Sequence, residues 1–474
     1  MKLSRVRRHL LRLAFPVILG LAILFGGSSL TGLSSRMWLS VAALIMLLAA
    51  IPIAAGRSWN RPALLGLGLF AAWSFWTLLQ QVPLPHYIWQ HLGDRSAVSD
   101  GLELMDLPAT KAMPISLAPS ESFLSLFGTL PPLAIFVLFV ALGWRFAAAR
   151  LNWAIPLFGA AGALLGLAQI LVGDSDYLYF YEVTARGLPV GVFANPNHQA
   201  CFLLMCLPFV AGLIGQLRRD WASGDSDHAK AIVITALAGL ILVGILAAGS
   251  VAGYALLLPV LVLSVLLARK PRSSGRPPIA SPAIVIVSTL AAVLLVAFSP
   301  VLDGLGVTSF ENSDLSRLGI WNVTGEIAEN HWLAGTGLGS FEDVYRLYEN
   351  PDTVTEKFVN HAHNDYLQAI VEFGLPGTVI LLAGVVLILV LFVRVWTRQG
   401  DEHRRLRRAA ATALLVLILH SFVDYPGRRP AIACLAATCF ALLVVNGDSE
   451  RQRRSKATKR PDIASPTDDR RLVI

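Results

Sequence analysis

Two histidines and an aspartate stand close together in FVNHAHNDYLQAIVEFGLPG, residues 358–377. Polar side chains beside so apolar a run are unfavourable unless they are hydrated or make specific interactions. His361, His363 and Asp365 alternate, so on an extended strand they would share one face, as metal ligands do. A histidine can also accept a proton near neutral pH, and Asn364 or Asp365 could cap a following helix. The residues leave open a metal site, a proton acceptor and a hydrated helix end.

Other polar residues border apolar runs in the same way. His420 and Asp424 are spaced i, i+4, which would place them on one face of a helix, and an ionisable pair at the edge of a span is a candidate for function. The planar fork of arginine suits it to bind phosphate oxygens. The arginine candidates are Arg186, Arg317, Arg428 and Arg429, of which the last two could instead snorkel to a membrane interface.

The elements that position these residues are predicted to be membrane-spanning helices. Of the 474 residues, 55% are hydrophobic and 15% are charged, and the mean hydropathy is +0.61. Ordinary globular domains contain about 25% charged residues. About twelve apolar runs are long enough to cross roughly 30 Å of hydrocarbon. They lie near 10–27, 37–55, 63–82, 123–142, 153–172, 197–217, 231–248, 253–268, 282–299, 375–393, 409–423 and 430–446. The composition therefore predicts an all-α polytopic membrane protein.

Basic residues predict the orientation of these spans. With both termini in the cytoplasm, about three-quarters of the 39 Lys and Arg fall in cytoplasmic segments, as the positive-inside rule requires. The net charge of +8 is then a signal of topology and gives no reason to expect nucleic-acid binding. We expect the large loop 300–365 on the outer side, as two short amphipathic helices on the membrane surface joined by the turn GTGLG. The charged segment 447–474 is predicted to be a disordered cytoplasmic tail.

Several motifs, taken in order, resemble those of the O-antigen ligase and polymerase family. His363, Asn364, nine residues, Gly374 and Gly377 fit the family pattern His-(Asn/Ser/Gln)-x9-Gly-x2-Gly. SRLGIWNVTGEIAENHWLAGTGLGSF, residues 316–341, is similar to the family's stretch of Arg, Trp and a Gly-x-Gly turn. Further similar pieces are LLQQVPLP, PISLAPSES, GVFANPNHQA and HSFVDYPGRRP. The resemblance spans roughly residues 63–446, with the O-antigen ligase-related region at about 190–380, within a membrane domain of residues 1–446.

The resemblance implies a GT-C-like, inverting glycosyltransferase that needs no metal or other cofactor. Such enzymes work at the periplasmic face of the bacterial inner membrane, among its lipids. They transfer a glycan from an undecaprenyl-diphosphate-linked donor to a hydroxyl, which lies on lipid A-core for a ligase and on growing O-antigen or exopolysaccharide for a polymerase. The sequence leaves these two open, together with a protein-directed O-glycosyltransferase. A lipid-linked glycan transporter or flippase is an alternative of another class.

The resemblance also assigns roles to residues. His363 matches the catalytic base and Arg317 the arginine that holds the diphosphate, whereas His361 has no counterpart. Members commonly have an arginine after a serine in the outer turn corresponding to 249–253, where this chain has Val251, and Arg186 is the candidate to replace it. The supporting residues are Asn364, Asp365, His420, Asp424, Arg428, Asn195 and Asn197. Among these we expect the His420–Asp424 pair to orient an arginine or close the site, and Asn195 or Asn197 to cap a helix with Pro196 in its first turn.

Overall fold

The computed structural model describes residues 5–28, 33–106, 112–173, 176–181, 186–225, 227–269, 317–353, 358–398 and 403–445. Three expectations lie outside these residues: the span near 282–299, the start of the outer loop at 300–316 and the tail at 447–474.

Helices account for every other predicted span. Eight helical segments among the described residues are long and apolar enough to cross a membrane, and two shorter apolar helices accompany them. The eight correspond to α2 (Leu33–Ala55), α3 (Arg61–Leu79), α6 and α7 together (Pro119–Phe127 and Leu130–Leu142), α9 (Leu151–Val172), α10 (Pro196–Ala222), α11 (His228–Ala247), α12 (Val251–Ala268) and α17 (Asp365–Thr397). The shorter ones belong to α1 (Arg5–Phe25) and α19 (Pro430–Val444), and α18 (Arg404–His420) begins with a basic turn. The chain is an all-α, multi-pass membrane protein, as predicted.

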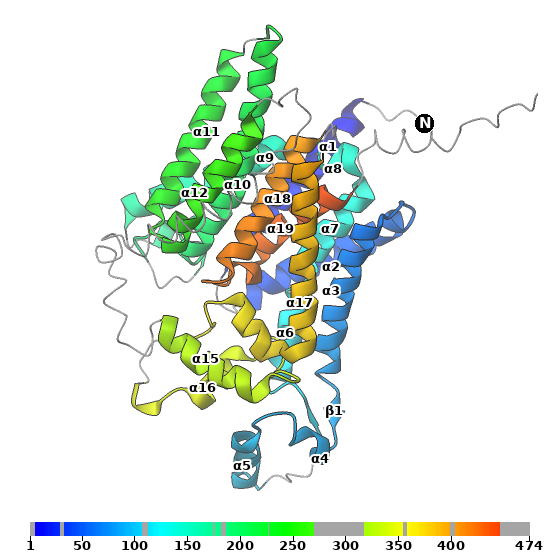
Figure 1. The fold of residues 1–474 in the computed structure, drawn as a ribbon, viewed down its shortest axis with the longest axis vertical. Coiled ribbons are helices and arrows are strands. Elements are labelled where there is room, and N and C mark those ends of the chain that lie inside the picture. Colours follow the sequence, from blue (N-terminus) through cyan, green and yellow to red (C-terminus); the bar gives the residue numbers. More distant parts are fainter. Residues whose placement is uncertain are drawn as a thin grey trace, which may run out of the picture.

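Helix α10 is the central element of the bundle. In its most apolar stretch 83% of the residues are buried, against 11% for both α3 and α17. It packs against α9, α11, α12 and α18, while α2, α3 and α17 lie towards the outside (Figure 1). Close packing against α10 requires a small residue at Gly159, where a Cβ would stand 2.8 Å from the Cβ of Cys206. The buried core therefore surrounds α10, and the peripheral helices present apolar side chains outward.

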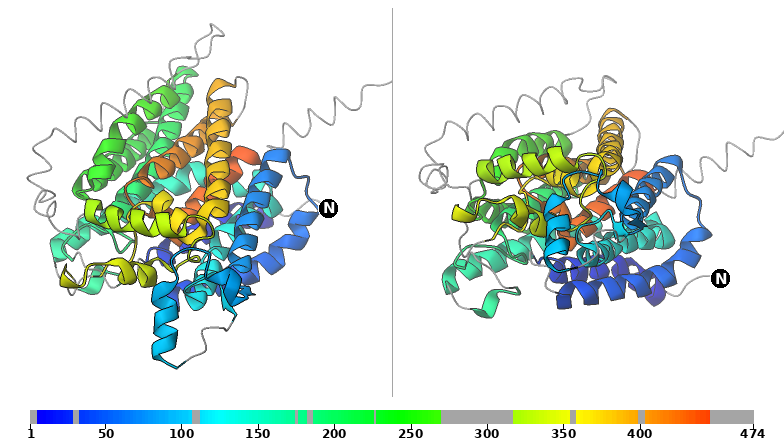
Figure 2. Two further views of the ribbon diagram at one scale, coloured as in Figure 1. Left: turned by 60° about the horizontal axis from the view of Figure 1, so that its bottom comes forward. Right: turned by 90° about the horizontal axis from the view of Figure 1, so that it is seen from below.

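Several segments far apart in the sequence meet at one end of the bundle, called here the loop-bearing end (Figures 1 and 2). It carries α15 (Arg317–His331), α16 (Phe341–Tyr348), α5 (Ser96–Leu104), α4 (His86–Trp89) and the short antiparallel pair of β1 (Pro83–Leu84) and β2 (Met113–Pro114). The remaining short elements are α8 (Trp144–Ala147), η1 (Asp176–Leu178), η3 (Pro351–Thr353) and η4 (Pro426–Arg428). Backbone hydrogen bonds join this end, including Ala194 N to Gly27 O, Ala431 N to Gly26 O and Leu117 N to Thr336 O.

The two helices predicted in the outer loop are present as α15 and α16. Ile327 of α15 and Phe341, Val344 and Tyr345 of α16 are buried together in a small core separate from the main one. The GTGLG turn connects the helices, and its three glycines all have positive φ. Only glycine adopts such backbone angles freely, which explains why this turn is so rich in glycine.

Helix α17 is broken at Gly374, where φ is 59° and ψ is −157°. An unbroken helix of 33 residues would be about 50 Å long, well beyond the roughly 30 Å of hydrocarbon. The break separates a short outer part, 365–373, from a part long enough to span the membrane. Carbonyls freed at the break accept hydrogen bonds from other segments: Val371 O from Thr336 N, Glu372 O from Gly337 N and Gln80 Nε2, and Phe373 O from Trp76 Nε1. The break at Gly374, a glycine of the His–Asn motif, thus allows α17 to bind the GTGLG turn.

Candidate functional site

The His–Asn motif lies where α17 begins. Asn364 caps the helix, because its Oδ1 accepts hydrogen bonds from the backbone N–H groups of Tyr366 and Leu367, each at 3.0 Å. This confirms a helix start and one of the two predicted capping residues. His363, immediately before the cap, has a φ of +50°, which is uncommon for a residue with a side chain. The backbone is therefore not the extended strand that would place His361, His363 and Asp365 on one face.

His363 faces Asp424, which lies 61 residues further along the chain. The distance from His363 Nδ1 to Asp424 Oδ1 is 3.3 Å, and the backbone N–H of Tyr425 donates to the same oxygen at 2.9 Å. The Asp424 side chain is fully buried, whereas 26% of the His363 side chain is exposed. With Nδ1–H turned to the carboxylate, Nε2 is the nitrogen left for a reacting group. This is the arrangement of a histidine base oriented by an aspartate.

Asp424 is ionised despite its burial. Burial raises the pKa of a carboxyl group, but the hydrogen bond from His363 and the positive charges of the surrounding groups, Arg317 among them, hold the pKa of Asp424 well below its usual range. Arg317 therefore lies near enough to act on this carboxylate. The structure thus places one principal residue predicted from the sequence, His363, in contact with Asp424 and the other, Arg317, within electrostatic range of Asp424.

Two more histidines are buried beside Asp424. His198 Nε2 lies 3.9 Å from Asp424 Oδ1, and His420 is the last residue of α18. Among the described residues, no hydrogen-bond partner contacts either ring nitrogen of His198 or His420, or the second carboxylate oxygen of Asp424. The helix ends at His420, and Asp424 lies in the turn that follows, with its N–H bonded to the His420 carbonyl. The predicted pair is therefore close, although only one member is in the helix.

Arg428 is held by two carboxylates of α17. Its Nε donates to Asp365 Oδ1 at 3.2 Å and its Nη1 to Glu372 Oε2 at 2.9 Å. Asp365 also accepts hydrogen bonds from Ser421 Oγ and the backbone N–H of Gly427. Asp365 and Glu372 therefore orient the arginine of this turn, while Asp424 orients His363. The side chain that Asp424 contacts is His363 and not an arginine, and the expectation that the His420–Asp424 pair orients an arginine or closes the site stays a prediction.

Arg429 and His361 form a further, partly buried contact. Arg429 Nη2 lies 3.1 Å from His361 Nε2, and Nη1 donates to the carbonyl of Ser28 at 2.8 Å. The guanidinium also lies over the ring of Tyr425, 5.0 Å from its centroid. Since Arg429 is fully buried and Arg428 is tied to α17, the snorkelling hypothesis for these arginines is wrong. A guanidinium donating to His361 Nε2 leaves that nitrogen unable to take a proton, so His361 is an anchor and His363 the available base.

The comparison with known families finds a match in the middle of the chain. The family model for O-antigen ligase matches residues 234–382. An O-antigen ligase domain is found at these residues, about a third of the chain. A search of the curated proteins finds no match. The domain, set in a multi-pass membrane fold, supports a membrane function of the O-antigen ligase or polymerase type.

The O-antigen ligase domain supplies only part of the cluster. It contains α11, α12, α15, α16 and the outer part of α17, and so Arg317, His363, Asp365 and Glu372. Asp424 and the two arginines come from the α18–α19 turn downstream, and His198 comes from α10 upstream. The site is therefore assembled across the domain boundary.

The remaining predicted residues lie around this cluster. Asn195 caps α10, accepting a hydrogen bond from Asn197 N at 2.8 Å, and Pro196 is the first residue of that helix; this confirms the capping prediction. Arg186 is exposed, in the loop that leads to α10. Val251, where the ligase family commonly has an arginine, is the first residue of α12, directly after the capping Ser250.

Sequence reasoning missed Glu372 and Gln368, and it gave no role to Trp321, the tryptophan of the family-like stretch. Gln368 Nε2 donates to Glu372 Oε1 at 2.9 Å and lies 3.1 Å from His361 Nδ1. Trp321 Nε1 donates to the carbonyl of Ala362 at 2.9 Å, so that α15 fixes the residue before His363. One signal could have found Glu372. It stands seven residues after Asp365, a spacing that puts both on one helix face, in a run with hardly any other charge.

Proposed function

We propose that this protein transfers a glycan from an undecaprenyl-diphosphate-linked donor to a hydroxyl acceptor at the periplasmic face of the bacterial inner membrane. The acceptor is lipid A-core if the enzyme is a ligase and growing O-antigen or exopolysaccharide if it is a polymerase. The contact between His363 Nδ1 and the buried Asp424 carries this proposal, because it leaves a partly exposed base in a domain of the O-antigen ligase family.

In this reaction His363 Nε2 takes the proton of the acceptor hydroxyl. The hydroxyl oxygen attacks the anomeric carbon of the donor sugar, the bond from that carbon to the diphosphate oxygen breaks, and the lipid diphosphate leaves with the electron pair. One direct displacement inverts the configuration at the anomeric carbon. The imidazolium formed on His363 is stabilised by Asp424, at 3.3 Å from Nδ1. The proton transfer needs no metal ion.

The leaving diphosphate requires a cation that is not already neutralised. Arg428 is unsuited to this, since Asp365 and Glu372 bind it from two sides. Arg317 is half-buried and stands at the start of α15. Its positive charge helps to lower the pKa of Asp424. We assign the diphosphate to Arg317, whose fork can bind two phosphate oxygens. Arg186, in the loop before α10, remains the second candidate on the strength of the sequence.

The distribution of polar groups favours an enzyme over a flippase. Transporters place ionisable side chains and broken helices near the middle of the membrane. Here the described ionisable cluster lies at the loop-bearing end, and the break in α17 at Gly374 is nine residues from its outer end. Chemistry at the membrane surface fits this placement.

The test uses a strain that lacks the chromosomal gene and expresses His363→Ala. We expect the variant to insert into the membrane at the normal level and to transfer no glycan, as seen by gel analysis of surface polysaccharide. His91→Ala, an exposed histidine of the loop-bearing end, is the matched control and should transfer normally. Normal transfer by His363→Ala would contradict the assignment of the base. In the deletion strain, accumulation of long lipid-linked polymer indicates a ligase, and accumulation of single lipid-linked repeats indicates a polymerase.

A further inference from the structure

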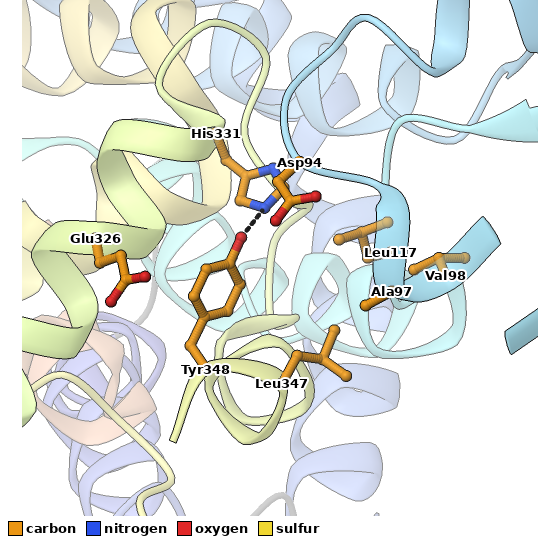
Figure 3. Close-up of a pocket in the computed structure, with 8 residues that line it drawn as sticks. All are labelled: Asp94, Ala97, Val98, Leu117, Glu326, His331, Leu347 and Tyr348. Carbon is orange, nitrogen blue, oxygen red and sulfur yellow. Dashed lines mark hydrogen bonds between the residues drawn. The ribbon is translucent and has the colours of Figure 1, made fainter. Parts of the chain in front are cut away.

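A second polar site lies at the loop-bearing end, away from the His363 cluster. A cavity of about 300 Å³ opens between the start of α5 and the helices α15 and α16. Asp94, Ala97, Val98, Leu117, Glu326, His331, Leu347 and Tyr348 line it. In Figure 3, Glu326 lies on one side, the apolar residues of α5 on the other, and the His331–Tyr348 pair between them. Its volume is at the lower end of the range for small-molecule sites.

The polar groups of this cavity are of the kinds that bind hydroxyl groups. His331 Nε2 and the Tyr348 hydroxyl are 3.2 Å apart and hydrogen-bond to each other. Asp94 and Glu326 are exposed carboxylates that accept hydrogen bonds. Burial, with the nearby charge of Arg95, lowers the pKa of His331 to about 4, so this histidine is neutral at pH 7. The lining is then negatively charged and disfavours phosphate or any other anion.

The opposite wall explains why a sugar suits the cavity better than a simple cation. Ala97, Val98, Leu117 and Leu347 present apolar surface, which a hydrated cation would not use. A sugar ring carries hydroxyl groups around its edge and C–H groups on its faces. The edge can donate to the carboxylates and exchange hydrogen bonds with Tyr348, while a face packs on the apolar wall.

Helix α15 links this cavity to the proposed catalytic site. Arg317 begins the helix near Asp424, and His331 ends it at the cavity. Fourteen steps of 1.5 Å separate these residues by roughly 21 Å along the axis. Between them the exposed residues Asn322, Glu326 and Asn330 recur every four positions, which aligns them along one side of the helix. This polar row follows α15 past the cavity, which Glu326 lines.

We propose that the cavity between α5, α15 and α16 is a glycan subsite, which binds an uncharged sugar ring of the substrate chain at the end of α15 remote from Arg317. The inference rests on the proposed function and adds to it a place where the enzyme recognises the glycan itself. Transfer would then depend on sugars several residues away from the bond that is formed. Such a cavity gives the enzyme a means to select its own glycan.

The experiment measures binding separately from transfer. The probe is the neutral oligosaccharide released by mild acid from the lipid-linked glycan of the same cells, titrated calorimetrically into the full-length protein in lipid nanodiscs. We expect wild-type protein to bind it, and Glu326→Gln to weaken binding about tenfold, the effect of losing hydrogen bonds to a charged acceptor. Glu329→Gln changes an exposed carboxylate of the same helix outside the cavity and should bind within twofold of wild type.

The variant His363→Ala separates this inference from the proposed reaction. It should bind the oligosaccharide normally and transfer nothing. If it transfers normally while Glu326→Gln still weakens binding, the base assignment fails and the subsite stands. The subsite is overturned if wild-type protein does not bind the oligosaccharide, or if Glu326→Gln binds as well as Glu329→Gln. It is also overturned if calcium chloride, and not the oligosaccharide, gives the heat that depends on Glu326.

Discussion

Replacing Asp424 with asparagine tests the catalytic pair most directly. The side chain keeps its shape and an oxygen that can accept the His363 Nδ1 hydrogen, but it loses the negative charge. That charge stabilises the imidazolium that forms when His363 takes the acceptor proton. Since Asp424 is fully buried, its replacement should leave substrate binding unchanged. The loss is expected in kcat, with KM close to the wild-type value.

The size of the effect follows from the 3.3 Å between Nδ1 and Oδ1. Two opposite unit charges at that distance attract by about 5 kcal/mol at an effective dielectric constant of about 20. At about 1.36 kcal/mol for each factor of ten in rate, the charge accounts for a factor between roughly 10³ and 10⁴. We expect Asp424→Asn to lower kcat by about 10³, because the asparagine oxygen still orients the ring.

The assay is glycan transfer by purified protein with lipid-linked donor in detergent. Asp365→Asn is the matched comparison, since Asp365 is a partly buried carboxylate of this end that binds Arg428 and Ser421. It should reduce kcat by much less than Asp424→Asn does. In a His363→Ala background Asp424→Asn should cause no further loss, because residues that act as a unit are not additive. A fall in kcat of less than tenfold for Asp424→Asn would refute the pairing.

Three further predictions concern the diphosphate, the helix break and pH. Arg317→Lys replaces a bidentate donor with a point charge and should lower kcat/KM by at least about tenfold in the transfer assay. An unchanged kcat/KM would show that Arg317 does not bind the diphosphate. Gly374→Ala places a Cβ 2.6 Å from Gly335 N at a φ of 59° and should destabilise the protein by about 3 kcal/mol, whereas Gly384→Ala, with open space around it, should not lower the melting temperature. His331 has a pKa of about 4 in the folded protein and about 6.5 in the unfolded chain. Between these two pH values the unfolded state binds more protons than the folded state, so the free energy of unfolding falls as the pH drops from about 6.5 to about 4. Between pH 7 and pH 5 the loss should be about 2 kcal/mol, and thermal unfolding of His331→Gln should show a smaller pH dependence; equal slopes would contradict the burial of a neutral histidine.

The helices and their caps were predictable because they depend on local sequence. An apolar run of about 20 residues has no other stable arrangement in a membrane than a helix. Asn364 and Asn195 cap their helices because a short side-chain oxygen reaches the free N–H groups of the first turn. The glycines of GTGLG predicted a turn for the same local reason. What these patterns could not supply is the break at Gly374, since a glycine followed by Leu375 and Pro376 is also compatible with a continuous, kinked helix.

The pairing of side chains was harder to predict because it depends on the tertiary fold. Histidine, aspartate and arginine are all candidates in HSFVDYPGRRP, and nothing in their spacing tells which one meets His363. The resemblance identified His363 and Arg317, but it did not show that Asp424 faces the histidine. The positive φ of His363 also has no signal in the sequence, although it turns this side chain to Asp424 while His361 meets Arg429.

The ion pairs of Arg428 are best understood as a positioning device. A buried ion pair adds little net stability, because removing two charges from water offsets most of their attraction. The contacts of Arg428 with Asp365 and Glu372 nevertheless tie the α18–α19 turn to α17. Glu372 is itself held through its carbonyl by Gln80 and Gly337. Asp424 belongs to that turn and His363 precedes that helix, so the ion pairs fix the distance between the proposed base and the carboxylate that orients it.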